Sequence, residues 1–149
     1  MENSLKILFA ADGSDYSTRA AHYLVTHFDW FRGTPELHLL HVKLPIPKGM
    51  AAVQAERLLG ENAIDNYYSE EAAASLAPTR AILEAQKVPF QSVYKVGNIA
   101  QEIQDYANKN QIDLIVMGSH GHGALANLLL GSVSTKVLAE TTVPVMLVR

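Results

Sequence analysis

Apolar residues follow two different patterns along the chain. Runs of consecutive Leu, Ile, Val and Ala residues are typical of strands buried on both faces, whereas apolar residues spaced three or four positions apart are typical of helices packed on a core. The runs predict five strands, over Leu5–Ala11, Glu36–Val42, Val88–Val96, Asp113–Met117 and Val143–Val148. Segments with helical spacing lie between the runs, so strands and helices are expected to alternate.

The predicted helices begin and end at residues suited to those positions. Ser14 can cap a first helix, and Gly33-Thr34-Pro35 ends it. An alanine-rich region that follows Gly49 and reaches about Lys87 is predicted to be helical, and Pro78 is expected to break or kink it. Asn98-Ile-Ala-Gln101 has the form of a capping box and opens the next helix.

Near-continuous apolar strands separated by helices predict an α/β fold, a Rossmann-like doubly wound parallel sheet with helices on both faces. Such sheets bind ligands beyond the carboxyl ends of their strands, where the winding order reverses. Polar, glycine-containing turns follow the first and the fourth strand, at Asp12-Gly13-Ser14 and at Gly118. If both turns contact one ligand, the two strands are neighbours and the five-stranded order is 3-2-1-4-5. We expect residues 1–149 to form a single domain.

The most informative motif is a glycine loop that follows the fourth strand. Gly118 and Gly121 come directly after the apolar run, and nine residues separate Gly121 from Gly131-Ser132, where a helical segment over Val133–Leu138 begins. Glycine allows close approach of the main chain to a ligand, and the first N–H groups of a helix lack partners within the helix. Together they form a candidate phosphate cradle, which indicates nucleotide binding.

Composition narrows the alternatives. Of 149 residues, 48% are hydrophobic and 18% are charged, as in globular proteins, and the formal net charge of −3 argues against a nucleic-acid partner or an anionic membrane surface. The chain contains no cysteine, which excludes disulfides and thiolate metal sites. No apolar run approaches the roughly 20 residues of a membrane span, and no signal-peptide stretch is present, so we expect a cytoplasmic protein.

These motifs together resemble the universal stress protein family over essentially the whole chain. The resemblance rests on Asp12-Gly13-Ser14, Leu39–Val42, Val96-Gly97, the Gly118-x2-Gly121-x9-Gly131-Ser132 loop and Val143–Val148. It implies a Rossmann-like five-stranded fold that is usually dimeric. It also implies membership of the branch that binds ATP, because family members with this glycine loop do so.

The resemblance assigns roles to individual residues. It implies that Asp12 accepts hydrogen bonds from the adenine or ribose side, that Val42 contacts the base, and that Met117 and Gly118 line the ribose. Main-chain N–H groups at the glycine loop and the following helix start would bind the phosphates, and Ser132 would add its hydroxyl. The predicted nucleotide-binding residues are Ala11, Asp12, Val42, Met117, Gly118, His120, Gly121, Gly131, Ser132 and Val133.

The predicted phosphate site has no strong cation in the sequence around it. No Lys or Arg lies between Gln111 and Thr135, so His120, His122 and main-chain dipoles are the groups expected to face the phosphates. Mg²⁺ coordinated mainly through the phosphates would supply positive charge, or else ADP or AMP would compete well with ATP. Both alternatives stay open.

Less specific interpretations exist for each motif. The glycines can serve as ordinary turn residues, Ser132 as a helix cap and Asp12 as a turn former. His120-Gly-His122 has the form of a metal-binding pair but lacks a third ligand in the sequence. Neither the P-loop nor the Gly-x-Gly-x-x-Gly dinucleotide motif fits the glycine spacing. His38 and His41 are expected to be hydrogen-bonded at the core edge, and Leu128–Leu130 to pack under the loop.

Three functions remain as hypotheses. The first is a nucleotide-responsive regulatory module, in which binding orders the Ala124–Leu130 loop and changes a surface that an unknown protein partner recognises. The second is a slow ATP hydrolase or phosphotransferase with His120 or His122 as its base, and no other catalytic residue. The third is a dimeric scaffold whose pocket stays empty, which a Gly131→Val substitution should leave intact while it blocks a nucleotide. A homodimer is expected through the edge strand Val143–Val148.

Overall fold

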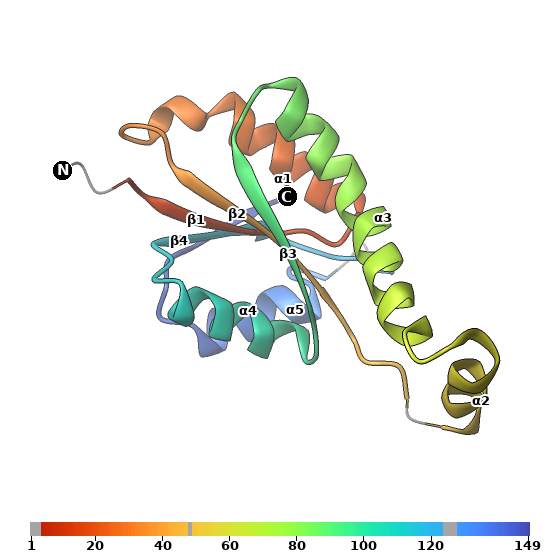
Figure 1. Ribbon diagram of the computed structural model, residues 1–149. Coiled ribbons are helices and arrows are strands. Elements are labelled where there is room, and N and C mark those ends of the chain that lie inside the picture. The colour runs from red at the N-terminus through yellow and green to blue at the C-terminus, as the bar shows by residue number, and fades with distance from the viewer. Residues whose placement is uncertain (1–3, 48, 124–127) are drawn as a thin grey trace.

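The computed structural model describes residues 4–47, 49–123 and 128–149. Its strands form one parallel sheet in the order β3-β2-β1-β4-β5, which confirms the predicted fold class and order (Figure 1). The strands are β1 (Lys6–Ala10), β2 (Glu36–Lys43), β3 (Phe90–Val96), β4 (Leu114–Gly118) and β5 (Val145–Val148). The helices are α1 (Asp15–Thr26), the short 3-10 helix η1 (Phe28–Trp30), α2 (Met50–Leu59), α3 (Ala63–Ala85), α4 (Ile99–Lys109) and α5 (Ser132–Glu140).

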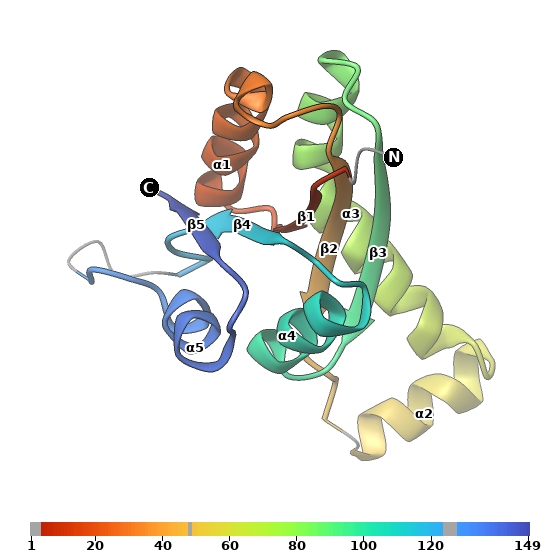
Figure 2. The ribbon, with the colours of Figure 1, turned by 90° about the vertical axis from the view of Figure 1, so that its left-hand side faces the viewer.

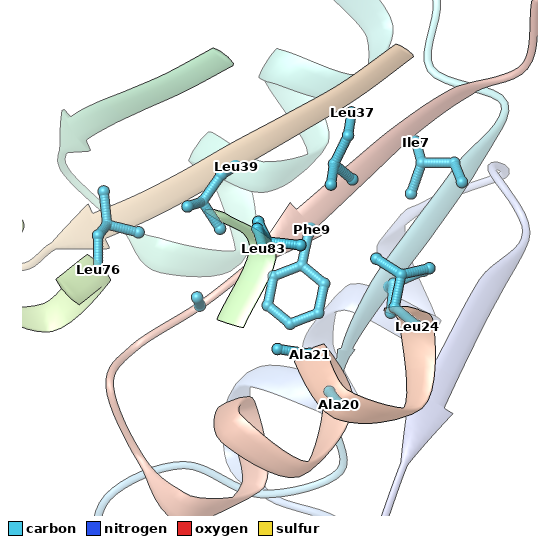
Figure 3. Close-up of a cluster of buried hydrophobic side chains, with 11 residues drawn as sticks. Ile7, Phe9, Ala20, Ala21, Leu24, Leu37, Leu39, Leu76 and Leu83 are labelled. Carbon is cyan, nitrogen blue, oxygen red and sulfur yellow. The ribbon is translucent and has the colours of Figure 1, made fainter. Parts of the chain in front are cut away.

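The sheet lies between two helical layers (Figure 2). Its central strands are apolar on both faces, since each face packs against one of these layers. Successive side chains of β1 point to opposite faces, and Phe9 packs with residues of α1 and α3 whereas Leu8 packs with residues of α4 and α5. Figure 3 shows Phe9 beside Ala20 and Ala21 of α1, whose small side chains leave room for its ring. No helix among the described residues has the length and apolar character needed to cross a membrane.

The winding order reverses at β1, and this brings the two polar turns together. β1 pairs with β2 on one side, through Ala10 and Leu40, and with β4 on the other, through Ala10 and Met117. The turn after β1 and the turn after β4 therefore leave the same edge of the sheet side by side. The adjacency that the predicted ligand site required is present.

The predicted effect of Pro78 is wrong in one respect, because the helical region is not broken there. α3 continues through Pro78, and the region divides instead at Gly60, whose φ of 102° ends α2 in a conformation that glycine adopts without strain. Leu76, Thr79 and Leu83, on either side of Pro78, are buried. Their packing holds the helix together where Pro78 removes a hydrogen bond.

Local signals located most other boundaries to within a few residues. Ser14 Oγ accepts a hydrogen bond from the Ser17 N–H at 3.3 Å, and Asn98 Oδ1 accepts one from the Gln101 N–H at 3.1 Å, which confirms both predicted caps. β3 starts at Phe90 rather than Val88, since the Val88 N–H bonds back to the Leu83 carbonyl at 3.0 Å and completes the end of α3.

Candidate functional site

A cavity of about 740 Å³ lies at the carboxyl edge of the sheet. Its walls come from the ends of β1, β2 and β4, the turn after β4, the start of α5, and side chains of α3 and α4. All the residues predicted to bind a nucleotide line it: Ala11, Asp12, Val42, Met117, Gly118, His120, Gly121, Gly131, Ser132 and Val133. The structure thus brings the predicted residues together, while their binding of a nucleotide stays a prediction.

The two carboxylate oxygens of Asp12 have different surroundings. Oδ1 accepts hydrogen bonds from the Ser14 N–H at 2.9 Å and from the Ser17 hydroxyl at 2.8 Å. Oδ2 points to Gly121, since a Cβ built there would lie 2.7 Å from it. Oδ1 therefore shapes the turn after β1, and Oδ2 is the oxygen placed to meet a ligand.

The environment of Asp12 keeps its carboxyl group ionised at neutral pH. Burial raises its pKa, but hydrogen bonds from Ser14 and Ser17 and the nearby His122 outweigh burial, so the pKa lies below its ordinary value. An ionised carboxylate accepts hydrogen bonds and repels phosphate. Asp12 therefore suits the hydroxyl or amine groups of a nucleoside and not its phosphates.

The glycines of the loop are required by the protein's own packing. A Cβ on Gly118 would lie 2.8 Å from Tyr16 Cβ and 2.9 Å from the Tyr16 carbonyl carbon, and a Cβ on Gly131 would lie 3.1 Å from His120 Cα. The Gly131 contact is tight and lies against main chain, so a side chain there requires the His120 backbone to shift by a few tenths of an ångström. The expectation that Gly131→Val would leave an empty scaffold intact stays a prediction.

Hydrogen bonds fasten the start of α5 to the end of β4. The Gly131 N–H donates to the Ser119 carbonyl at 2.8 Å, and the Ser134 hydroxyl reaches the Gly118 and Ser119 carbonyls at 3.1 and 3.0 Å. Gly131 is the N-cap of α5, so Ser132 is the first helical residue rather than the cap. The N–H groups of Ser132 and Val133 lie in the first turn, where they have no acceptor within the helix.

The two histidines of the turn each donate to a main-chain carbonyl. His120 Nε2 lies 2.8 Å from the Leu128 carbonyl and its Nδ1 lies 2.8 Å from Ser119 Oγ, so in the neutral ring Nε2 donates and Nδ1 accepts. His122 Nε2 lies 2.8 Å from the Asp12 carbonyl. His120 has both nitrogens engaged, and the described residues contribute no hydrogen bond to Nδ1 of His122. Residues 4–47, 49–123 and 128–149 contain no cluster of three or more His, Cys, Asp or Glu side chains suited to a metal.

Sequence reasoning missed several residues of the cavity wall. They are Ser17, His41, Lys43, Leu44, Glu71, Ser75, Ile99, Ile103 and Leu128, among others. Lys43 directly follows Val42 at the end of a strand, which is a local signal that was available. Glu71 and Ser75 lie in a helix without any motif, and only the packing of α3 beside β2 places them here.

The two histidines of β2 differ. His38 Nδ1 lies 2.7 Å from the Tyr106 hydroxyl and its Nε2 lies 2.9 Å from Glu36 Oε1, which confirms that His38 is hydrogen-bonded. His41 Nδ1 lies 2.8 Å from the Ala11 carbonyl, but its buried Nε2 has no partner among the described residues. His41 therefore holds the segment that leads into Asp12.

The prediction for Leu128–Leu130 is wrong for two of its three residues. Leu128 and Leu129 are 48% and 74% exposed, so neither is packed beneath the loop. Leu128 lines the cavity instead, where its carbonyl holds His120. Residues 124–127 of the Ala124–Leu130 loop lie outside the described residues, and the predicted ordering of that loop stays a prediction.

Comparison with known proteins agrees with this architecture. The model of the universal stress protein family matches residues 4–149. Universal stress protein YxiE of Bacillus subtilis is 33% identical over 147 residues, which cover 97% of this chain and 98% of YxiE. Universal stress protein MJ0577 of Methanocaldococcus jannaschii is 30% identical, with 97% of this chain and 94% of MJ0577 covered.

Solved structures extend the agreement to three dimensions. The structure of MJ0577 matches with a TM-score of 0.72 at 29% identity, over 97% of this chain and 94% of that one. A universal stress protein family protein from Arabidopsis thaliana, solved with AMP bound, matches with a TM-score of 0.64 at 18% identity, over 97% of this chain and 90% of that one, and shares the fold. The family model and the full-length relatives show that this chain belongs to the universal stress protein family.

Proposed function

We propose that this protein binds an adenine nucleotide in the cavity at the carboxyl edge of the sheet. We also propose that it is a regulatory module in the stress response, in which a partner distinguishes the nucleotide-bound protein from the free one. The observation that carries the proposal is the convergence of four separate segments on that cavity: the ends of β1, β2 and β4 and the start of α5. A family member with the same fold is solved with AMP, which supports an adenine nucleotide as the ligand.

The start of α5 provides the phosphate end. Its first N–H groups, at Ser132 and Val133, carry the positive end of the helix dipole, and the Ser132 hydroxyl is exposed beside them. These donors suit an anion and do not suit a metal ion. Mg²⁺ is therefore expected to arrive with ATP, coordinated through its phosphates.

The end of β2 provides the base end. The Leu40 carbonyl accepts from the Ala11 N–H on the β1 side, and the Lys43 carbonyl accepts from the Gly97 N–H on the β3 side, both at 2.9 Å. Peptide groups of successive strand residues alternate in direction, so the N–H and C=O of Val42 point to the β1 side, where β1 has already ended. One donor and one acceptor there match the edge of adenine.

Enzymatic turnover is the less favoured function. A hydrolase needs a base that can accept a proton from water, and both ring nitrogens of His120 already have partners. His122 Nδ1 is the remaining ring nitrogen at this turn, and a slow ATPase would depend on it. We propose binding without appreciable turnover, and we expect His122→Gln to leave nucleotide affinity within about twofold.

A charge placed at the start of α5 tests the binding site. Ser132→Asp puts a carboxylate where a helix favours it, so the free energy of unfolding should be unchanged or higher by about 0.5 kcal/mol. The same carboxylate would repel phosphates, so we expect the affinity for ATP to fall at least about tenfold while the affinity for adenosine stays within about twofold. Calorimetric titration measures both affinities, and Ser132→Ala is the control for loss of the hydroxyl alone.

Two results would count against the proposed site. If calorimetric titration shows no heat and thermal unfolding shows no stabilisation with ATP, ADP or AMP at millimolar concentration, the protein does not bind a nucleotide. An unchanged ATP affinity in Ser132→Asp would show that the phosphates lie elsewhere. Titrations of ATP, ADP and AMP with and without Mg²⁺ show which nucleotide binds most tightly and whether Mg²⁺ is needed for ATP to bind.

We also propose a homodimer that forms through β5. This strand has a neighbour only on the β4 side of the described sheet, and its side chains are all partly exposed. An edge strand carries unpaired peptide groups that can pair with a second copy. Light scattering at tens of micromolar should give twice the chain mass, and a monomer at that concentration would contradict the proposal. A cytoplasmic location and an unidentified protein partner complete the proposed function.

A further inference from the structure

An ion pair stands at the β2 side of the cavity, and the proposed nucleotide-binding function leaves it without a role. Lys43 Nζ, at the end of β2, lies 3.5 Å from Glu71 Oε2 of α3. Both residues line the cavity, and their side chains are 33% and 44% exposed. The pair joins the sheet to α3 while it remains open to a ligand.

The Lys43–Glu71 pair lies on the side of the cavity opposite the start of α5, where the phosphates are proposed to bind. In the order β2-β1-β4, β2 is two strand spacings from β4, or roughly 10 Å. A nucleotide whose phosphates meet α5 beside β4 would extend over Asp12 and place its base at β2. Asp12 is directed elsewhere, because Oδ1 is held by Ser14 and Ser17 and Oδ2 points to Gly121. Lys43 and Glu71 are the charged side chains on the β2 side of the described wall.

We propose that Glu71 adds to the base preference that the Val42 main chain gives this site, by accepting a second hydrogen bond from the 6-amino group of a purine. The inference rests on the proposed function. The amino group has two hydrogens, and the Val42 carbonyl and the Glu71 carboxylate supply one acceptor each. A 6-oxo purine would instead direct a carbonyl oxygen at both acceptors, which is repulsive.

Lys43 acts in this scheme as a positioning residue. A glutamate that is 44% exposed loses side-chain entropy when it is held in one conformation. The ammonium group of Lys43 favours the conformation in which the Glu71 carboxylate lies at the cavity. Lys43→Met should therefore weaken the base preference without removing the acceptor itself.

The test compares the 5′-monophosphates of adenosine and inosine, which differ at the purine 6-position and at N1. We expect the unmodified protein to bind AMP about tenfold more tightly than IMP by calorimetric titration. In Glu71→Gln, whose amide can either donate or accept, the ratio should fall to about threefold, the part of the preference that the Val42 main chain still provides, and Lys43→Met should give an intermediate ratio. The matched control is Glu70→Gln, an exposed neighbour on α3 that does not line the cavity, and it should keep the original ratio.

The outcomes separate this inference from the function on which it rests. Equal affinities for AMP and IMP in the unmodified protein, or an unchanged ratio in Glu71→Gln, would overturn the role of Glu71 and leave nucleotide binding intact. Failure of the unmodified protein to bind either nucleotide would overturn both. Thermal unfolding midpoints of the variants should match that of the unmodified protein, since a purely structural role would change the midpoint and not the ratio.

Discussion

Replacing Asp12 with alanine is expected to destabilise the fold by about 2 kcal/mol and to weaken nucleotide binding at least about tenfold. The stability loss follows because the Ser14 N–H and the buried Ser17 hydroxyl would lose the carboxylate oxygen that accepts from both, at 2.9 and 2.8 Å. The loss of affinity follows because Oδ2 is the oxygen that points to Gly121 at the cavity. Urea unfolding and calorimetric titration measure the two effects.

Asparagine at position 12 separates the two roles. Its amide oxygen can still accept from Ser14 and Ser17, so the free energy of unfolding should fall by less than about 1 kcal/mol. Its amide nitrogen would replace Oδ2, so nucleotide affinity should fall nearly as far as in Asp12→Ala. Asp15→Asn, an exposed carboxylate one turn away, is the control and should change neither quantity much. Full affinity in Asp12→Asn would show that Oδ2 does not contact the ligand.

The lowered pKa of Asp12 also gives a pH dependence with a definite sign. The folded-state pKa lies below the value of about 3.9 expected for the unfolded chain. A carboxyl group of this kind stabilises the fold at pH values above its unfolded pKa, and that contribution disappears as the pH falls through the folded pKa. The stability difference between the unmodified protein and Asp12→Asn should therefore be constant from pH 5 to 7 and shrink below about pH 4. A difference that grows on acidification would contradict this assignment.

Gly118→Ala is expected to cost about 3 kcal/mol, the upper end of the range for an added methyl group in a packed interior. The new Cβ would lie 2.8 Å from Tyr16 Cβ and 2.9 Å from the Tyr16 carbonyl carbon. Relief would require α1 to move away from β4, and the two elements share a buried core with β1. Thermal or urea unfolding measures the loss.

The control for Gly118→Ala is Gly49→Ser. Gly49 caps α2, a Cβ there would meet nothing within 4 Å, and serine is a good cap residue. The free energy of unfolding of the Gly49→Ser variant should differ from that of the unmodified protein by less than about 0.5 kcal/mol. A Gly118→Ala variant as stable as the control would show that the contact with Tyr16 is looser than the structure indicates.

The strand order could be predicted because the polar turns that follow two apolar runs carry complementary chemistry. Asp12 after β1 and Gly118 at the end of β4 suggested a shared ligand, and a parallel doubly wound sheet allows that only when the two strands are neighbours. Caps at Ser14 and Asn98 were equally visible, because a cap bond spans only three residues.

Other features depended on contacts that no local pattern encodes. Pro78 suggested a helix break, and the helix continues because its flanking residues are buried against the sheet. The sequence placed His120 and His122 near the predicted phosphates, and it did not show that each donates to a carbonyl that folding brings close, from Leu128 and Asp12. Glu71 carried no signal at all, since its place in the cavity wall depends on where α3 crosses β2.

The sequence by itself determined the alternation of strands and helices, because hydrophobic periodicity and turn residues act over short distances. The order of the sheet followed only when the two polar turns were taken to share one ligand at the carboxyl edge. Only the tertiary structure decided which side chains complete the cavity and which neighbouring residues leave no room for a side chain at the glycines. Lys43 and Glu71 meet across 28 positions of the chain, and Gly118 makes room for Tyr16 of another element. Such contacts depend on the relative placement of packed elements, which is a property of the whole core rather than of any segment.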